Sequence, residues 1–324
     1  MSTRAPMAVQ VSDPTYGPQL DPREGDVTDV RVDVEPVRWE PLSPAPRDAP
    51  ELVFVDGVQQ VEAWLNVTPH DDPAPVFGVA FAVGAGAVVA DGARARVEEI
   101  AVQRVVLTEG GRCLHLPTQG GFSWDVRAGG SGDPGSMAAR VAGFRRDLEQ
   151  AIAERMAARD RLVVLDGRLS FLRETKHPVI GAVKSHHAMY LQGEHAGVVT
   201  ALRAGQRTPL FAIGDDRFGW YQRLPNVGDA GWAGIVRGEV SQGFGLATAQ
   251  RLADLAACTL PRYAGRPHRD ARAPQNMQPI MALEQRLRHR LGDRRLAFRA
   301  VRVACAAAVL DDAPSGRAPL RVVA

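Results

Sequence analysis

Apolar residues recur along the chain in two patterns, which predict strands in some segments and helices in others. Short uninterrupted apolar runs, typical of buried strands, begin at Leu52 and Leu162, and each ends in an Asp-Gly pair that predicts a turn. After the first of these turns, 58–67 predicts a returning strand. The apolar segments 75–90 and 98–107, separated by another Asp-Gly pair, predict a meander of antiparallel strands.

Helical spacing marks the middle and the end of the chain. From Met137, behind a glycine-rich loop and the candidate N-cap Ser136, apolar side chains recur every three or four residues, which predicts an amphipathic helix. Segments 247–257 and 279–291 predict two further helices. This order of elements is typical of one α/β domain. The remaining apolar runs predict strands at 179–183, 208–213, 232–240 and 296–303.

Composition sets the boundaries of this domain. Residues 1–50 contain nine of the 23 prolines and nine acidic residues without a helical period, which indicates an extended arm with local strand pairing around 30–37. The α/β domain is expected to span 51–305, followed by a tail at 306–324. Three widely spaced cysteines favour a reducing cytoplasm over a disulfide framework. No apolar stretch reaches the roughly 20 residues of a membrane span, so no membrane is expected.

Carboxylates stand at the ends of two predicted strands. Asp56 and Asp166 would lie at the carboxyl edge of the sheet, where open α/β sheets place their sites, and Glu149 lies on the helix before the second strand. Such oxygen ligands suit Mg²⁺ or Mn²⁺, which can activate water for phosphodiester hydrolysis. Taken singly, each Asp-Gly pair also fits ordinary turn chemistry, and Glu149 fits a solvated helix face.

Basic residues are unevenly placed and are almost all arginine. The formal charge of +2 excludes a polycation, but residues 251–300 hold eleven arginines against four acids. Lys184, one of only two lysines, follows a predicted strand, where a compact ammonium suggests a charge directed at phosphate; a surface lysine is the alternative. Arginines can neutralise phosphates and an aromatic residue can stack on bases, so their combination indicates a nucleic-acid interface. An ordinary solvated loop is the alternative. The candidate residues of the interface are Arg168, Arg262, Tyr263, Arg266, Arg269 and Arg272.

At these motifs the chain resembles the NurA family of nucleases. The resemblance covers roughly residues 50–305 and rests on the Asp-Gly pairs at Asp56 and Asp166, the helix carrying Glu149, and the strand that ends at Lys184. It implies an RNase H-like mixed sheet flanked by helices, with an extended N-terminal arm. It also implies a catalytic Mn²⁺ or Mg²⁺ ion held by the three acids. In the nuclease hypothesis Lys184 helps to position the scissile phosphate.

The same resemblance implies partners and a cellular role. NurA nucleases suggest a homodimer that docks on a HerA-like hexameric ATPase and degrades DNA ends during resection or repair, as a 5′-3′ exonuclease, a single-strand endonuclease or both. The chain has no Walker A sequence, so energy for translocation would come from the partner.

Two departures from the NurA pattern leave alternatives open. The family often has Asp-Gly-Ser where this chain has Val58 and Arg168 at the third position, and it commonly places a metal-binding histidine on the C-terminal helix. Asn276 and Glu284 are the candidates for that fourth ligand. These departures favour the alternative of an inactive RNase H-like DNA-binding or adaptor subunit. A third reading is a metal phosphatase that acts on small phosphoesters.

Overall fold

The computed structural model describes residues 29–46, 51–67, 76–92, 94–129, 133–159, 161–169, 176–184, 186, 190–225, 231–270 and 272–312. The rest of the predicted arm and the tail beyond 312 lie outside the described residues. The strands are β1 (Val30–Arg31), β2 (Leu52–Val67), β3 (Val76–Ala90), β4 (Ala95–Thr108), β5 (Arg112–His115), β6 (Asp125–Ala128), β7 (Leu162–Asp166), β8 (Val179–Val183), β9 (Phe211–Ile213), β10 (Arg217–Arg223), β11 (Ile235–Ser241) and β12 (Val309–Asp312). The helices are α1 (Pro134–Ala157), α2 (Gly193–Ala201), α3 (Leu246–Thr259), α4 (Gln278–Leu291) and α5 (Arg294–Ala304).

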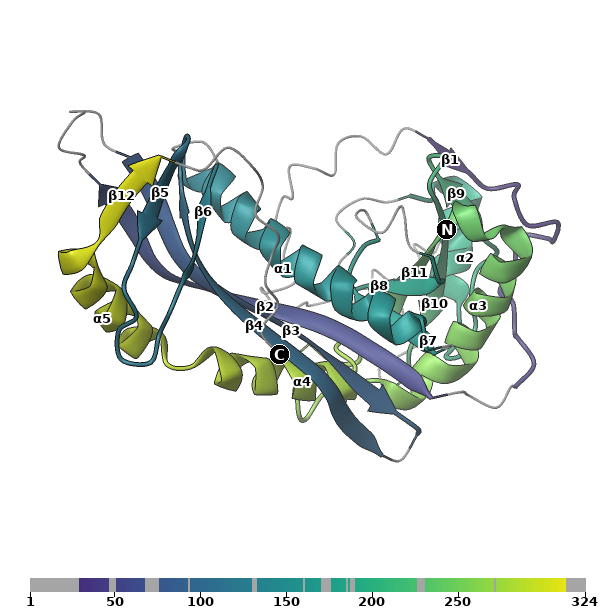
Figure 1. The fold of residues 1–324 in the computed structure, drawn as a ribbon. Helices are drawn as coiled ribbons and strands as arrows, with labels where there is room; N and C mark the ends of the chain where they lie inside the picture. The colour runs from purple at the N-terminus through teal and green to yellow at the C-terminus, as the bar shows by residue number, and fades with distance from the viewer. Residues whose placement is uncertain are drawn as a thin grey trace, which may run out of the picture. The chain divides into compact units, whose positions relative to one another are not determined.

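The predicted mixed α/β class is confirmed. Ten strands form one sheet in the order β1-β9-β10-β11-β8-β7-β2-β3-β4-β6, and β5 pairs with β12 in a separate small sheet (Figure 1). The large sheet mixes antiparallel pairs such as β10 and β11 with parallel pairs such as β7 and β8. No helix among the described residues is long and apolar enough to cross a membrane. The chain consists of two compact units. Unit 1 comprises Met1–Phe54, Val88–Arg96 and Ala153–Met281, and unit 2 comprises Val55–Ala87, Val97–Ile152 and Ala282–Ala324.

Unit 1 has a helix on each face of its strands. One core cluster joins α3 to side chains of β10 and β11, including Trp220 and Val236. The next residue of β10, Tyr221, packs in a second cluster with Val199 of α2. Because successive strand residues point to opposite faces, the almost continuously apolar strands bury both of their faces, as sheets covered on both sides do.

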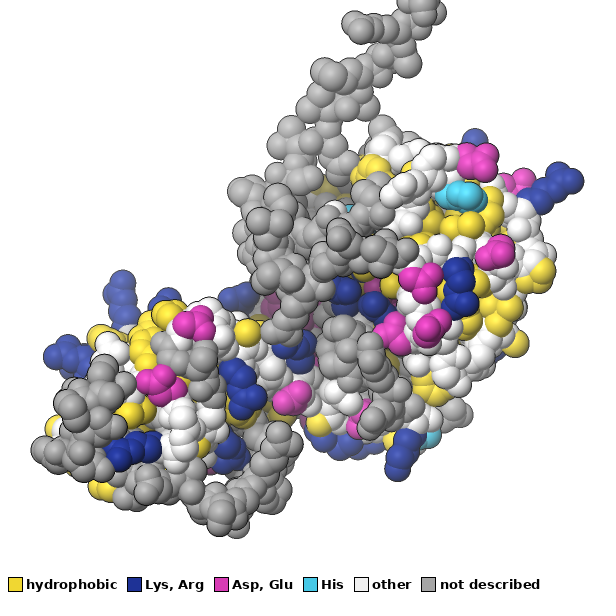
Figure 2. All heavy atoms as spheres, turned by 90° about the horizontal axis from the view of Figure 1, so that it is seen from above, with side chains coloured by type: hydrophobic (Ala, Val, Ile, Leu, Met, Phe, Trp, Pro, Cys, Tyr) yellow, Lys and Arg dark blue, Asp and Glu magenta, His cyan; other side chains and the backbone are white. Residues whose placement is uncertain are grey.

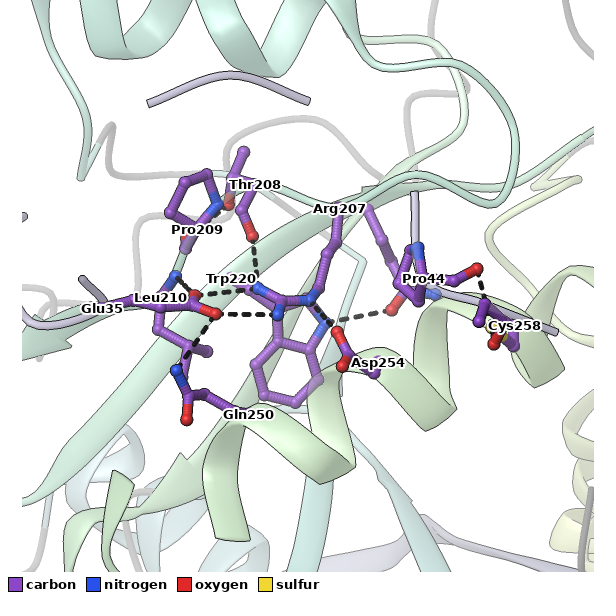
Figure 3. A network of polar contacts seen from close by, with 12 residues as sticks. Glu35, Pro44, Arg207, Thr208, Pro209, Leu210, Trp220, Gln250, Asp254 and Cys258 are labelled. Carbon is purple, nitrogen blue, oxygen red and sulfur yellow. Dashed lines mark hydrogen bonds and ion pairs between the residues drawn. The ribbon is translucent and has the colours of Figure 1, made fainter. Parts of the chain in front are cut away.

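The described N-terminal segment is anchored to the rest of unit 1 by a buried ionic network (Figure 3). Glu35 accepts two hydrogen bonds of 2.9 Å from the Arg207 guanidinium and one of 2.6 Å from the backbone N–H of Leu210. Arg207 also donates to Asp254 of α3 at 2.7 Å. Of the strand pairing expected around 30–37, the structure shows Val30 and Arg31, which pair with β9.

Unit 2 also packs helices against both faces of its strands. Ala80 of β3 belongs to a cluster with α5, whereas the next residue, Phe81, packs on Phe144 of α1 with ring centroids 5.3 Å apart. Glycine lets α4 approach β3 closely, because a Cβ atom at Gly86 would lie 3.0 Å from a methyl group of Leu283. Large side chains at this position are therefore excluded.

The turn predicted at Asp56-Gly57 and the strand returning from it are wrong. β2 continues through both residues as one strand of 16 residues, and the sheet places β7 and β3 beside it. At Asp166-Gly167 the prediction is confirmed, because β7 ends at Asp166 and Gly167 has a φ of +118°. Asp-Gly permits a turn but does not require one, and here both residues of the first pair are part of an extended strand.

The strand predicted at 296–303 is also wrong, because this segment belongs to helix α5. Asp293 caps it by accepting hydrogen bonds from the backbone N–H groups of Arg295 and Leu296. The alternation of arginine with apolar residues resembles a strand pattern, but the buried positions follow helical spacing. These positions are Ala297, Ala300, Val301 and Ala304.

Smaller differences concern element ends and short elements. The predicted N-cap Ser136 is wrong, because α1 begins at Pro134 and the Asp133 carboxylate accepts the Ser136 N–H at 2.9 Å. Of 208–213 only Phe211–Ile213 is a strand, and β10 and α2 were not predicted. The strands predicted at 75–90, 98–107 and 179–183 and the helices at 247–257 and 279–291 are confirmed with small shifts at their ends.

We expect Gly238→Ala to destabilise unit 1 by about 2 kcal/mol, because the added methyl group would overlap the fully buried Trp220 indole and force repacking. Gly197→Ala in α2 is the matched control. A Cβ atom there meets nothing within 4 Å, so this change should be neutral or stabilising. Urea unfolding of both variants measures the difference, and equal stabilities would contradict the packing at Gly238.

Candidate active site

A polar contact within unit 1 lies at the carboxyl ends of two parallel strands. β7 and β8 run side by side with Asp166 opposite Ala182, so the ends of both strands coincide. Lys184, just beyond β8, therefore reaches Asp166, and its Nζ donates to Asp166 Oδ2 at 2.7 Å. The Lys184 side chain is 7% exposed and that of Asp166 is 18% exposed. The structure thus brings together two of the residues predicted from the sequence.

Asn276 extends this contact into a chain of polar groups. Its Oδ1 accepts a hydrogen bond from Lys184 Nζ at 3.0 Å, and its Nδ2 donates to Asp270 Oδ2 at 2.5 Å. Asn276 is fully buried. Burial would raise the pKa of Asp270, but the backbone N–H of Arg272 and the Asn276 amide outweigh this and hold the pKa below its ordinary value.

A buried glutamate that the sequence did not reveal fixes the loop after Asp166. Glu239 of β11 accepts the backbone N–H of Leu169 at 3.2 Å and pairs with Arg237 at 2.9 Å and Arg217 at 3.1 Å. Burial of Glu239 would raise its pKa, but these two arginines hold it below the ordinary value. The loop also packs closely on Gly181, where a Cβ atom would lie 2.8 Å from the Gly167 carbonyl oxygen. Asp166 is thereby held on a rigid support.

Unit 2 contains a close pair of carboxylates, Asp56 and Glu284. Asp56 of β2 is 5% exposed, Glu284 of α4 is partly buried, and carboxylate oxygens of the two lie within 4.8 Å. Two carboxylates this close repel each other unless a cation offsets their charge. Glu284 is one of the two residues predicted from the sequence as a fourth ligand, and the fold places it beside Asp56.

The Glu149 side chain contacts β2 at Gly57, the residue after Asp56. A Cβ atom at Gly57 would lie 2.9 Å from Glu149 Cγ, so only a glycine leaves room for this side chain. Glu149 also pairs with Arg145 one turn earlier in α1. Neighbouring residues of a strand point to opposite faces of the sheet. Glu149, which lies against Gly57, is therefore on the face opposite to the Asp56 side chain. A metal-binding role for Glu149 stays a prediction.

The donor chemistry fits a divalent cation. Asp56 and Glu284 of unit 2, and Asp166 of unit 1, all offer carboxylate oxygens as donors. Hard ions such as Mg²⁺ and Mn²⁺ prefer these donors. The structure favours a different use for Asn276, because the oxygen that would bind a metal already accepts a hydrogen bond from Lys184.

The predicted nucleic-acid residues divide into exposed and buried ones. Arg262, Arg266 and Arg269 are exposed, and Arg168 is partly buried. The prediction that Tyr263 stacks on bases is wrong. Its ring is 5% exposed and packs on Phe54 with centroids 5.0 Å apart.

Three further observations limit the predicted nucleic-acid interface. Tyr263 is fixed by its hydroxyl group, which accepts the Gly92 N–H at 2.9 Å and donates to the Ala90 carbonyl oxygen at 3.3 Å. Arg272 pairs with Asp270 at 3.4 Å and so belongs partly to the polar chain described above. On the face drawn in Figure 2, basic and acidic side chains are interspersed. The exposed arginines therefore remain the candidates for phosphate contacts.

Comparison with known proteins identifies similar solved structures. No protein-family model matches the chain, and no curated protein sequence matches it either. The NurA nuclease from Sulfolobus solfataricus overlaps with a TM-score of 0.45 at 11% identity, over 78% of this chain and 84% of that one. NurA bound to dAMP and manganese gives 0.22 at 16% identity, over 40% and 22%. The endonuclease V from Bacillus subtilis gives 0.33 at 13% identity, over 74% and 79%. The solved structures to which this chain is similar thus include NurA nucleases.

Proposed function

We propose that this chain is a metal-dependent nuclease that hydrolyses phosphodiester bonds in DNA. The observation that carries the proposal is the pair of close carboxylates Asp56 and Glu284, which Asp166 would join as the third oxygen donor of the metal site. Lys184 adds a cation beside Asp166. Acids that hold a divalent ion, next to a group that binds phosphate, are what phosphodiester hydrolysis requires.

Each residue has a distinct role in this proposal. Asp56, Asp166 and Glu284 would hold the ion, which supplies Lewis-acid stabilisation and a nucleophilic water at neutral pH. Lys184 binds a non-bridging phosphate oxygen and offsets its charge. The exposed arginines, Arg262, Arg266 and Arg269, contact backbone phosphates without reading sequence.

The finer activity and the partners are also proposed. We infer a 5′-3′ exonuclease or single-strand endonuclease that acts at DNA ends in resection or repair. We further propose a homodimer that works with a HerA-like hexameric ATPase. Co-purification of the full chain with such an ATPase, and a DNA-dependent change in its cleavage products, would support this assembly.

Metal removal tests the catalytic proposal directly. We expect the purified full chain to degrade end-labelled single- or double-stranded DNA in Mn²⁺ or Mg²⁺, to lose this activity when a chelator is added in excess, and to recover it when Mn²⁺ is restored. DNA binding without cleavage under every metal condition would overturn the nuclease and support the adaptor alternative. Cleavage of a chromogenic phosphomonoester but not of DNA would support a phosphatase.

A further inference from the structure

The Lys184 ammonium is held from two sides. Asp166 Oδ2 accepts one of its protons at 2.7 Å and Asn276 Oδ1 accepts another at 3.0 Å. A lysine ammonium has three donors, so these contacts leave one for a substrate oxygen. Lysine is flexible, and ordering its side chain costs up to about 2 kcal/mol of rotamer entropy. The contacts from Asp166 and Asn276, here called the cage, already order Lys184 before substrate binds, so this cost does not fall on binding.

Asn276 is in turn held by its own segment. Its Nδ2 donates to Asp270 at 2.5 Å, and its backbone N–H donates to the Arg272 carbonyl oxygen at 3.0 Å. Asp270 also accepts the backbone N–H of Arg272 at 2.8 Å. Asp270 therefore joins Arg272 and Asn276 within one turn. The Asn276 amide cannot rotate without breaking its contact with Asp270 or with Lys184.

We propose that Asp270 and Asn276 are positioning residues that aim Lys184 at a non-bridging oxygen of a nucleic-acid phosphate. This inference rests on the proposed nuclease function and assigns a role to two residues that need not touch substrate. A fixed cation is more effective than a mobile one because it requires no reorganisation as charge develops on the phosphate. The polar chain runs from Asp270 through Asn276 and Lys184 to Asp166.

The lysine content of the chain provides a test that does not depend on nuclease activity. Lys176 is exposed and Lys184 is the only other lysine, so limited acetylation followed by mass spectrometry compares a caged lysine with an internal control. In metal-free full-length protein we expect Asp270→Ala to raise acetylation of Lys184 several-fold. Asp270→Asn should restore most of the protection, because its amide oxygen still accepts from Asn276. Lys176 should react equally in all proteins.

Control variants separate positioning from folding. Asp215→Ala removes an exposed carboxylate of unit 1 and should leave Lys184 as protected as in wild type. If Asp270→Ala does not fold, judged by its thermal transition, Asn276→Ala removes the contact directly and should expose Lys184 in the same way. Wild-type protection of Lys184 in a folded Asp270→Ala or Asn276→Ala protein would overturn the proposal.

Kinetics then connect the cage to the reaction. We expect Asp270→Ala to lower kcat for DNA hydrolysis by about tenfold with little change in KM, the size typical of residues that orient an active-site group, and Asp270→Asn to recover most of it. A loss confined to KM would overturn the positioning role. If wild type cleaves no DNA, the proposed function fails, whereas the acetylation result still decides whether the cage exists.

Discussion

Asp56→Asn and Asp166→Asn should each lower metal-dependent DNA hydrolysis by at least about a hundredfold. Both changes keep the size of the side chain but remove the charge that a divalent ion needs, and losing even residues that orient metal ligands costs about 10- to 100-fold. Initial rates on end-labelled DNA at saturating Mn²⁺ measure the effect. Asp215→Asn, which changes an exposed carboxylate, is the matched control and should keep the wild-type rate.

A measurement of Mn²⁺ binding decides which glutamate completes the site. The structure places Glu284 near Asp56, whereas Glu149 packs against Gly57 and pairs with Arg145. We therefore expect Glu284→Gln to weaken Mn²⁺ binding, measured by calorimetry, more than Glu149→Gln does. Wild-type binding and hydrolysis in the Asp56, Asp166 and Glu284 variants alike would contradict the metal site as a whole.

Arg207→Met should destabilise the protein by about 3–5 kcal/mol. It removes the partner of Glu35 and leaves that carboxylate buried, which is the costly way to break a buried ion pair. Urea unfolding of the full chain measures the loss. The double variant Glu35→Gln with Arg207→Met should be more stable than Arg207→Met alone, because it leaves no buried charge. A double variant that is no better would show that Glu35 gains little from Arg207.

The same pair predicts how stability depends on pH. Burial would raise the pKa of Glu35, but Arg207 and the Leu210 N–H outweigh it and hold the pKa below the ordinary value. A lowered pKa contributes stability that is present above the ordinary glutamate pKa of about 4.3 and is lost as the pH falls through the lower folded value. We expect Glu35→Gln to flatten this acid limb and Glu40→Gln, at an exposed position, to leave it unchanged.

The sequence predicted the elements whose signal is local. Apolar runs gave β3, β4, β7 and β8, and helical spacing gave α1, α3 and α4, because burial on one or both faces leaves a period in the residues themselves. It did not predict α5, where arginines alternate with apolar residues and only contact with the unit 2 cluster shows which of them are buried. Tyr263 was misread for the same reason, since an aromatic between arginines looks exposed until its partner Phe54 is known.

By itself the sequence determined that carboxylates stand on β2 and β7 and that a rare lysine directly follows β8, because these follow from residue identity and strand position. Only the tertiary structure decided their partners. Glu284 lies 228 residues after Asp56 and Asn276 lies 92 residues after Lys184, and no local pattern encodes such pairs. Helix packing and sheet order set them, because close packing fixes which distant side chains meet.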